Sequence, residues 1–200
     1  EDHRLDTAYC AKWTHGLVER GYTVFVIDHR FAPAARIDAI TADAQRAVRY
    51  VRMHAQQYGV DPEHIGAIGH SSGGHLAAVQ AVVTLAAPFE LATVAEQPDA
   101  DTRAWMRSVL VDLVGPMSAD SMAVRLAAAS PYTLLTADDA PLLMLHADDD
   151  PVVPFAQATR MVAHARATGV EVHELLSSGG GHNPALDLEA IDAWFGKHLE

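Results

Sequence analysis

The sequence is poor in cysteine, in basic residues and in long apolar runs, and each shortage excludes a class of protein. Its 200 residues include one cysteine, Cys10, so no disulfide can form within the chain. Fourteen basic residues stand against 26 acidic ones, and the formal net charge of −12 disfavours a nucleic-acid or anionic-membrane partner. No apolar run reaches the length of a membrane span, and the first residues, Glu1-Asp2-His3-Arg4, do not resemble a signal peptide. We therefore expect a cytoplasmic protein without a transmembrane segment.

Apolar runs of strand length alternate with segments of helical spacing, and this alternation predicts an α/β fold. Strands are expected at residues 22–28, 65–68, 81–86, 142–146 and 170–176. Helices are expected at residues 37–58, 155–165 and 188–199, with Gly59 and Gly169 ending the first two. Such an order is typical of a mostly parallel sheet with helices on both faces. We expect one domain over residues 1–200.

Residues 89–140 interrupt this alternation. They contain helical patches near residues 104–114 and 121–129. The segment is either a cap that shapes a substrate pocket or a set of helices packed on the sheet, and the sequence leaves both interpretations open.

The stretch Gly69-His70-Ser71-Ser72-Gly73-Gly74-His75 has the G-x-S-x-G pattern of a nucleophile elbow. It follows a predicted strand, and Leu76-Ala77-Ala78-Val79 behind it suits the start of a helix. Small neighbours allow a strained turn that exposes the Ser71 hydroxyl, and the helix start offers unpaired backbone N–H groups. The pattern predicts Ser71 as a nucleophile, with His70 and His75 supporting the elbow.

A serine nucleophile needs a base, and the base needs an acid that orients it. The acid is expected after a later strand, where Asp148, Asp149 and Asp150 are adjacent. Asp150 is the best candidate because Pro151 follows it, whereas Asp148 and Asp149 are interpreted as a solvated acidic loop. Glu90 is the second candidate. A metal site built from His146 and these aspartates is not expected, since the sequence supplies no closed ligand set around them.

His182 is the predicted base. It lies in the stretch Ser177-Ser178-Gly179-Gly180-Gly181-His182-Asn183-Pro184, between the last predicted strand and the last predicted helix. Three glycines give this loop the backbone freedom to bring an imidazole over the edge of the sheet.

Further segments resemble the esterase/lipase branch of the α/β-hydrolase superfamily, which includes hormone-sensitive-lipase-like and feruloyl- or acetyl-esterase-like enzymes. Residues 28–33 (DHRFAP) are similar to the family's D-Y-R-L-A-P segment, and residues 58–65, 129–131 and 150–154 match as well. The resemblance implies Ser71 as nucleophile, Asp150 as acid, His182 as base and the Ser72 N–H as an oxyanion donor. It also implies a small-molecule ester substrate and no metal or organic cofactor.

The sequence departs from this family in two respects that bear on the fold. Only a handful of residues separate His75 from the strand predicted at 81–86, far fewer than the family's elbow helix occupies. The 200 residues contain no H-G-G-G-type oxyanion loop. In the family, the strand before that loop lies between the counterparts of the strands predicted at 22–28 and 65–68. We therefore expect an N-terminally incomplete α/β-hydrolase fold, in which those two strands either leave a gap or pair directly. A pared-down domain with a rearranged sheet is the alternative.

The expected function is a serine carboxylester hydrolase for small or medium acyl esters. An acylaminoacyl-peptidase-like or arylformamidase-like hydrolase and a degenerate, non-catalytic hydrolase-fold module are the alternatives. The sequence carries no signal for the oligomeric state.

Overall fold

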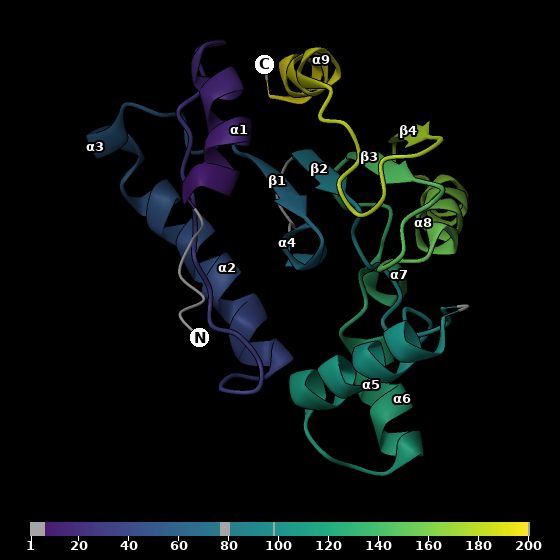
Figure 1. Ribbon diagram of the computed structural model, residues 1–200. Helices are drawn as coiled ribbons and strands as arrows, with labels where there is room; N and C mark the ends of the chain where they lie inside the picture. The colour runs from purple at the N-terminus through teal and green to yellow at the C-terminus, as the bar shows by residue number, and fades with distance from the viewer. Residues whose placement is uncertain (1–6, 77–80, 98, 200) are drawn as a thin grey trace.

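The fold is seen in a computed structural model, which describes residues 7–76, 81–97 and 99–199 (Figure 1). Its strands are β1 (Gly66–His70), β2 (Ala81–Leu85), β3 (Leu142–Ala147) and β4 (Val172–Ser177). Its helices are α1 (Thr7–Val18), α2 (Ile37–Met53), α3 (Ala55–Tyr58), α4 (Ser72–Leu76), α5 (Ala100–Val114), α6 (Ala119–Ala128), α7 (Pro131–Leu134), α8 (Phe155–Thr168) and α9 (Leu188–His198).

The described strands form one parallel sheet in the order β1-β2-β3-β4. Gly66 pairs with Ala81, Leu85 with Leu145, and Leu145 with Leu175. The central strands β2 and β3 are buried along their whole length, while β1 and β4 at the edges are partly exposed. The predicted α/β fold is confirmed, and four of the five predicted strands are found within two residues of their expected bounds.

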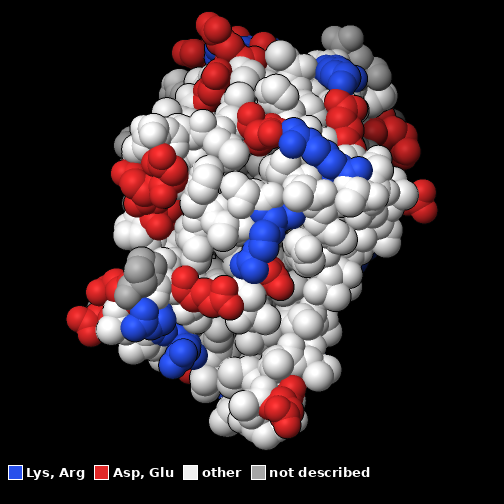
Figure 2. All heavy atoms as spheres, turned by 90° about the vertical axis from the view of Figure 1, so that its right-hand side faces the viewer, with Lys and Arg blue, Asp and Glu red and all other residues white. Residues whose placement is uncertain are grey.

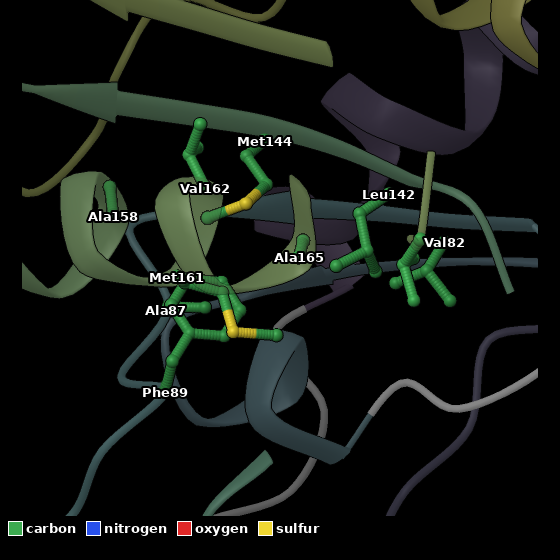
Figure 3. Packing of buried hydrophobic residues seen from close by; sticks show 10 residues of the cluster. Val82, Ala87, Phe89, Leu142, Met144, Ala158, Met161, Val162 and Ala165 are labelled. Atoms are coloured by element: carbon green, nitrogen blue, oxygen red, sulfur yellow. The ribbon is translucent and has the colours of Figure 1, made fainter. Parts of the chain in front are cut away.

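Alternation of side chains along the central strands separates two apolar cores. Val82 in β2 and Met144 in β3 point to one face and belong to an apolar cluster that also contains Met161 of α8 (Figure 3). Val83 and Leu143 point to the opposite face, which is covered by α9 and the end of α1 (Figure 1). Because helices cover both faces of the sheet, side chains on both sides of β2 and β3 are buried. The sequences of these two strands are therefore almost continuously apolar.

The prediction of a strand over residues 22–28 is wrong. These residues are assigned to no strand, and among the described strands β1 pairs with β2 alone. A cavity of about 1090 Å³ follows this edge of the sheet, with residues 24–27 on one wall and residues 67–70 on another. Phe25, Val26 and Ile27 accordingly stay 36%, 46% and 43% exposed. A β-rich sequence forms a ladder only where a partner lies within hydrogen-bonding distance, so the structure has the gap and not the direct pairing.

The helix predicted over residues 37–58 is present but is divided at His54 into α2 and α3. Gly59 ends α3 with φ of +67°, and Gly169 ends α8 with φ of +92°. Both glycines therefore have the left-handed conformation that favours this residue after a helix.

Residues of the segment 89–140 make up most of a third apolar cluster. Met106 and Leu110 of α5 pack with Leu126 of α6 and with Ile37 at the start of α2, and Val152 lies partly buried against them. The helices α5 and α6 lie together below the sheet in Figure 1. The Gln97 side chain also donates a 2.6 Å hydrogen bond to the Val152 carbonyl. The segment thus contacts the loop that follows β3, and its role as a cap stays a prediction.

Charges of both signs are dispersed over the face of the molecule shown in Figure 2, with uncharged residues between them. This face has no continuous basic area. Within the described ranges, no helix has both the length and the apolar character needed to cross a membrane.

Candidate active site

Ser71 occupies a strained turn between β1 and α4. Its φ of +53° lies in the left-handed region, which residues with a side chain rarely adopt. The Ser71 N–H donates to the Leu85 carbonyl of β2 at 2.8 Å, and the Ser71 carbonyl accepts from the His75 N–H at 3.3 Å. The turn is therefore held by hydrogen bonds to the neighbouring strand and to the helix that follows.

Two glycines of the elbow are required by close approach. A Cβ on Gly69 would lie 2.3 Å from the carbonyl carbon of Gly73, and a Cβ on Gly74 would lie 2.6 Å from the Cβ of Ala87. A Cβ on Gly73 would meet no atom of the described residues within 4 Å. Of the two glycines in the G-x-S-x-G pattern, the turn sterically requires Gly69 but not Gly73. The second required glycine is Gly74, one position after the motif.

The three residues predicted as nucleophile, acid and base lie together. His182 Nε2 is 2.9 Å from Ser71 Oγ, and His182 Nδ1 is 2.9 Å from Asp150 Oδ2 and 3.1 Å from Asp150 Oδ1. They come from the segments that follow β1, β3 and β4, whose carboxyl ends meet at one edge of the sheet. The spacing allows a proton to pass from the serine hydroxyl to the imidazole.

The Asp150 carboxylate is enclosed and well supplied with donors. Its side chain has no exposed surface. Burial by itself raises the pKa of Asp150, but the hydrogen bonds from His182 and from the backbone N–H groups of Val153 and Val152 together bring that pKa below its ordinary value. His146 Nε2 lies 3.5 Å from Asp150 Oδ2 and donates to the Val153 carbonyl at 3.0 Å. Asp150 is therefore charged at neutral pH and ready to orient an imidazole.

Asp148 and Asp149 are exposed, as expected for a solvated acidic loop, but both carboxylates also accept hydrogen bonds from the loop that carries His182. Asp148 accepts hydrogen bonds from the Gly179 N–H at 3.0 Å and from the Ser178 hydroxyl at 2.8 Å. Asp149 accepts from the Gly181 N–H at 2.8 Å. Both carboxylates thus hold the loop that carries His182, a function that sequence reasoning missed because the two loops meet only in the folded sheet.

The other candidates of the sequence occupy different positions. The Glu90 carboxylate accepts from the Thr93 hydroxyl at 2.9 Å and lies 3.3 Å from Arg160. Ser72 is the first residue of α4. The part of the chain that the structure describes holds no cluster of three or more histidine, cysteine or acidic side chains arranged for a metal ion.

The two histidines that flank the elbow each donate to a main-chain carbonyl. His75 Nδ1 lies 2.9 Å from the Pro88 oxygen, and His70 Nε2 lies 2.6 Å from the His182 oxygen. Burial lowers the pKa of both imidazoles below the ordinary histidine value, so both are neutral at pH 7. A neutral imidazole that donates to a carbonyl is suited to support the elbow and its neighbouring loop.

A parallel sheet with helices on both faces, a strained serine after β1 and an aspartate and histidine after later strands define an α/β hydrolase. The described fold is similar to a carbohydrate esterase from gut microbiota, with a TM-score of 0.81 and 26% identity over 92% of this chain and 76% of that one. The chain belongs to the BD-FAE family, whose family model matches residues 1–125 and 78–164.

Two mycobacterial proteins are similar in sequence. The chain is 30% identical to Esterase LipQ of Mycobacterium tuberculosis over 87% of its own length. It is also 30% identical to the probable carboxylic ester hydrolase LipM of the same organism, over 75% of its length. The match spans 45% of LipQ and 39% of LipM, so the chain covers less than half of these relatives.

Proposed function

We propose that this chain carries a serine carboxylester hydrolase site for small or medium acyl esters. The observation that supports it most is the chain of hydrogen bonds from Ser71 Oγ through His182 to Asp150, with 2.9 Å on each side of the imidazole. A serine hydroxyl becomes nucleophilic when a neighbouring base accepts its proton, and that base needs a carboxylate to orient it.

The proposed reaction has two steps. Ser71 Oγ attacks the ester carbonyl while its proton passes to His182 Nε2, and Asp150 stabilises the imidazolium. The imidazolium then returns the proton to the departing alkoxide, so an alcohol leaves and an acyl-serine ester remains. A water molecule then attacks the acyl-serine ester while its proton passes to His182. The carboxylic acid leaves, and His182 returns the proton to Ser71 Oγ. These groups supply every proton transfer, so the proposed mechanism uses no metal or organic cofactor.

The Ser72 N–H is the proposed oxyanion donor within these residues. It belongs to the residue after the nucleophile, at the start of α4. A second donor is worth on the order of 3 kcal/mol of transition-state stabilisation, or roughly a hundredfold in rate. We therefore expect p-nitrophenyl acetate hydrolysis to be faster when the chain is extended at its N-terminus by a segment with an H-G-G-G-type loop. Equal rates with and without the extension would contradict this expectation.

The relatives support an ester as the substrate class. LipQ is named as an esterase, LipM as a probable carboxylic ester hydrolase, and the structural neighbour as a carbohydrate esterase. The segment at residues 89–140 is the proposed wall of the acyl pocket, because its Gln97 contacts the loop that carries Asp150.

Labelling with a fluorophosphonate probe tests the proposal directly. We expect the folded chain to be labelled and to hydrolyse p-nitrophenyl acetate, and Ser71→Ala to abolish both. Ser108→Ala is a matched control, because this serine lies exposed on α5 and its hydroxyl donates to the Trp105 carbonyl of the same helix. Labelling that survives in Ser71→Ala would disprove the assignment of the nucleophile.

Two alternatives have different outcomes in the same assays. Faster cleavage of aryl amides or formamides than of the matched esters would favour the acylaminoacyl-peptidase-like or arylformamidase-like function. A folded protein without labelling or hydrolysis, with and without the N-terminal extension, would favour a non-catalytic module.

A further inference from the structure

The loop that carries His182 has little conformational restraint of its own. Gly179, Gly180 and Gly181 precede the histidine, with φ values of +83°, +122° and +60°. Glycine at positive φ has more accessible backbone conformations in the absence of other contacts than any other residue. An imidazole that must stay within hydrogen-bonding distance of a hydroxyl therefore depends on contacts between this loop and its surroundings.

Several of these contacts come from the loop after β3. Asp148 and Asp149 accept from the N–H groups of Gly179 and Gly181, and Asp150 accepts from the His182 ring. All of these restraints come from residues 148–150, in the loop that follows β3. They orient the ring about Nδ1 but connect it to β3, not to the strand that presents the nucleophile.

His70 supplies a contact from the strand that presents the nucleophile. It is the last residue of β1 and directly precedes Ser71. Its Nε2 lies 2.6 Å from the carbonyl oxygen of His182, and the two rings lie with their centroids 5.0 Å apart. A carbonyl oxygen can only accept, so the proton of the neutral His70 ring must be on Nε2.

We infer that His70 is a positioning residue, whose Nε2–H fixes the main chain of His182 and thereby holds His182 Nε2 against Ser71 Oγ. Because His70 and Ser71 are adjacent, one rigid strand end determines the position of both the nucleophile and the base. This inference rests on the proposed function of Ser71 and His182. The residue before the nucleophile would then position the base as well as support the elbow.

Two substitutions separate the hydrogen bond from the packing of the ring. His70→Phe keeps a planar ring beside His182 and Trp13 but removes the donor, whereas His70→Gln places an amide N–H near the position of Nε2. We expect His70→Phe to lower kcat for p-nitrophenyl acetate about tenfold, with KM changed less than twofold, because a lost hydrogen bond of this kind misplaces the base without altering the substrate pocket. We expect His70→Gln to recover most of the lost kcat. His173→Phe, at an exposed position of the opposite edge strand β4, is the matched control.

Proton NMR of the resting protein supplies a second measurement that does not need turnover. The His182 Nδ1–H shared with Asp150 is expected to give a low-field resonance in the unmodified chain and in His70→Gln. The same resonance should broaden through faster exchange in His70→Phe, at equal Tm. Equal kcat and equal line width in His70→Phe and the unmodified chain would overturn the inference, and so would equal losses in the Phe and Gln variants.

Failure of the proposed function is distinguishable from failure of this inference. If the folded chain is neither labelled nor active, with and without the N-terminal extension, the proposed function fails, and the resonance comparison alone decides whether His70 holds His182. If the chain is active and Ser71→Ala removes the activity, the proposed function stands whatever the His70 variants show.

Discussion

The backbone N–H of Ser71 donates to the carbonyl oxygen of Leu85 at 2.8 Å, so the turn that bears the proposed nucleophile is tied to the neighbouring strand. This bond requires α4 to begin close against β2. The approach is close enough that Gly74 of α4 lies against Ala87, with no space for a side chain between them. The strained φ of Ser71 is therefore maintained by packing around the turn as well as by the turn's own sequence.

Gly73 and Gly74 provide a matched pair of substitutions within α4. Gly74→Ala should destabilise the protein by about 1–3 kcal/mol, because its Cβ would overlap the Cβ of Ala87. Gly73→Ala should leave Tm unchanged or raise it slightly, since its Cβ would meet none of the described residues within 4 Å and alanine favours a helix more than glycine does. Thermal unfolding measures both variants, and an equal fall in Tm would contradict the expected difference.

Asp150→Asn should reduce ester hydrolysis by about 10³- to 10⁴-fold while the fold is retained. The amide keeps the size of the carboxylate but cannot stabilise the imidazolium or hold the Nδ1–H tautomer of His182. Steady-state kinetics with p-nitrophenyl acetate provide the measurement. Asp101→Asn, exposed in the first turn of α5, is the control with the same chemical change. A loss below tenfold in Asp150→Asn would argue against Asp150 as the acid.

His146 should make the protein less stable as the pH falls from about 7 to 5. Its side chain is 1% exposed, and burial lowers its pKa below the ordinary value of about 6.5 in spite of the nearby Asp150 carboxylate. In this pH range the unfolded chain binds more protons at His146 than the folded chain does, so acid favours unfolding.

Urea unfolding at pH 7.5 and pH 5.5 measures this effect. His146→Gln, which retains a donor for the Val153 carbonyl, should lose less stability between the two pH values than the unmodified chain. One such group accounts for at most about 1.4 kcal/mol per pH unit. The same pH dependence in both proteins would exclude His146 as a source.

The amides of residues 24–27 should exchange with deuterium much faster than those of residues 82–85. Residues 24–27 are assigned to no strand and face the cavity at the edge of β1, whereas β2 is paired on both sides and buried. Hydrogen exchange followed by mass spectrometry compares the two segments within one sample. Equal protection would show that the 22–28 run forms a ladder after all.

The sequence predicts most of the fold because the local signals agree with one another. Continuous apolar runs identify β2 and β3, and Gly59 and Gly169 mark the helix ends where the structure has left-handed residues. The run at residues 22–28 carries an equally strong strand signal but has no partner in the described sheet. Strand propensity is a property of the sequence, whereas a ladder needs a second strand, so this element could not be decided locally.

Some features of the candidate site could likewise be predicted from the sequence, whereas others depend on the tertiary structure. The order of Ser71, Asp150 and His182 in three loops after three strands is a property of the sequence, because parallel strands bring such loops to one edge. Only the tertiary structure decided that Asp148 and Asp149 hold the His182 loop, that Gly74 and not Gly73 is sterically required, and that His70 donates to the His182 carbonyl. Each of these depends on distances between segments far apart in the chain, and the packing of the sheet and its helices sets those distances.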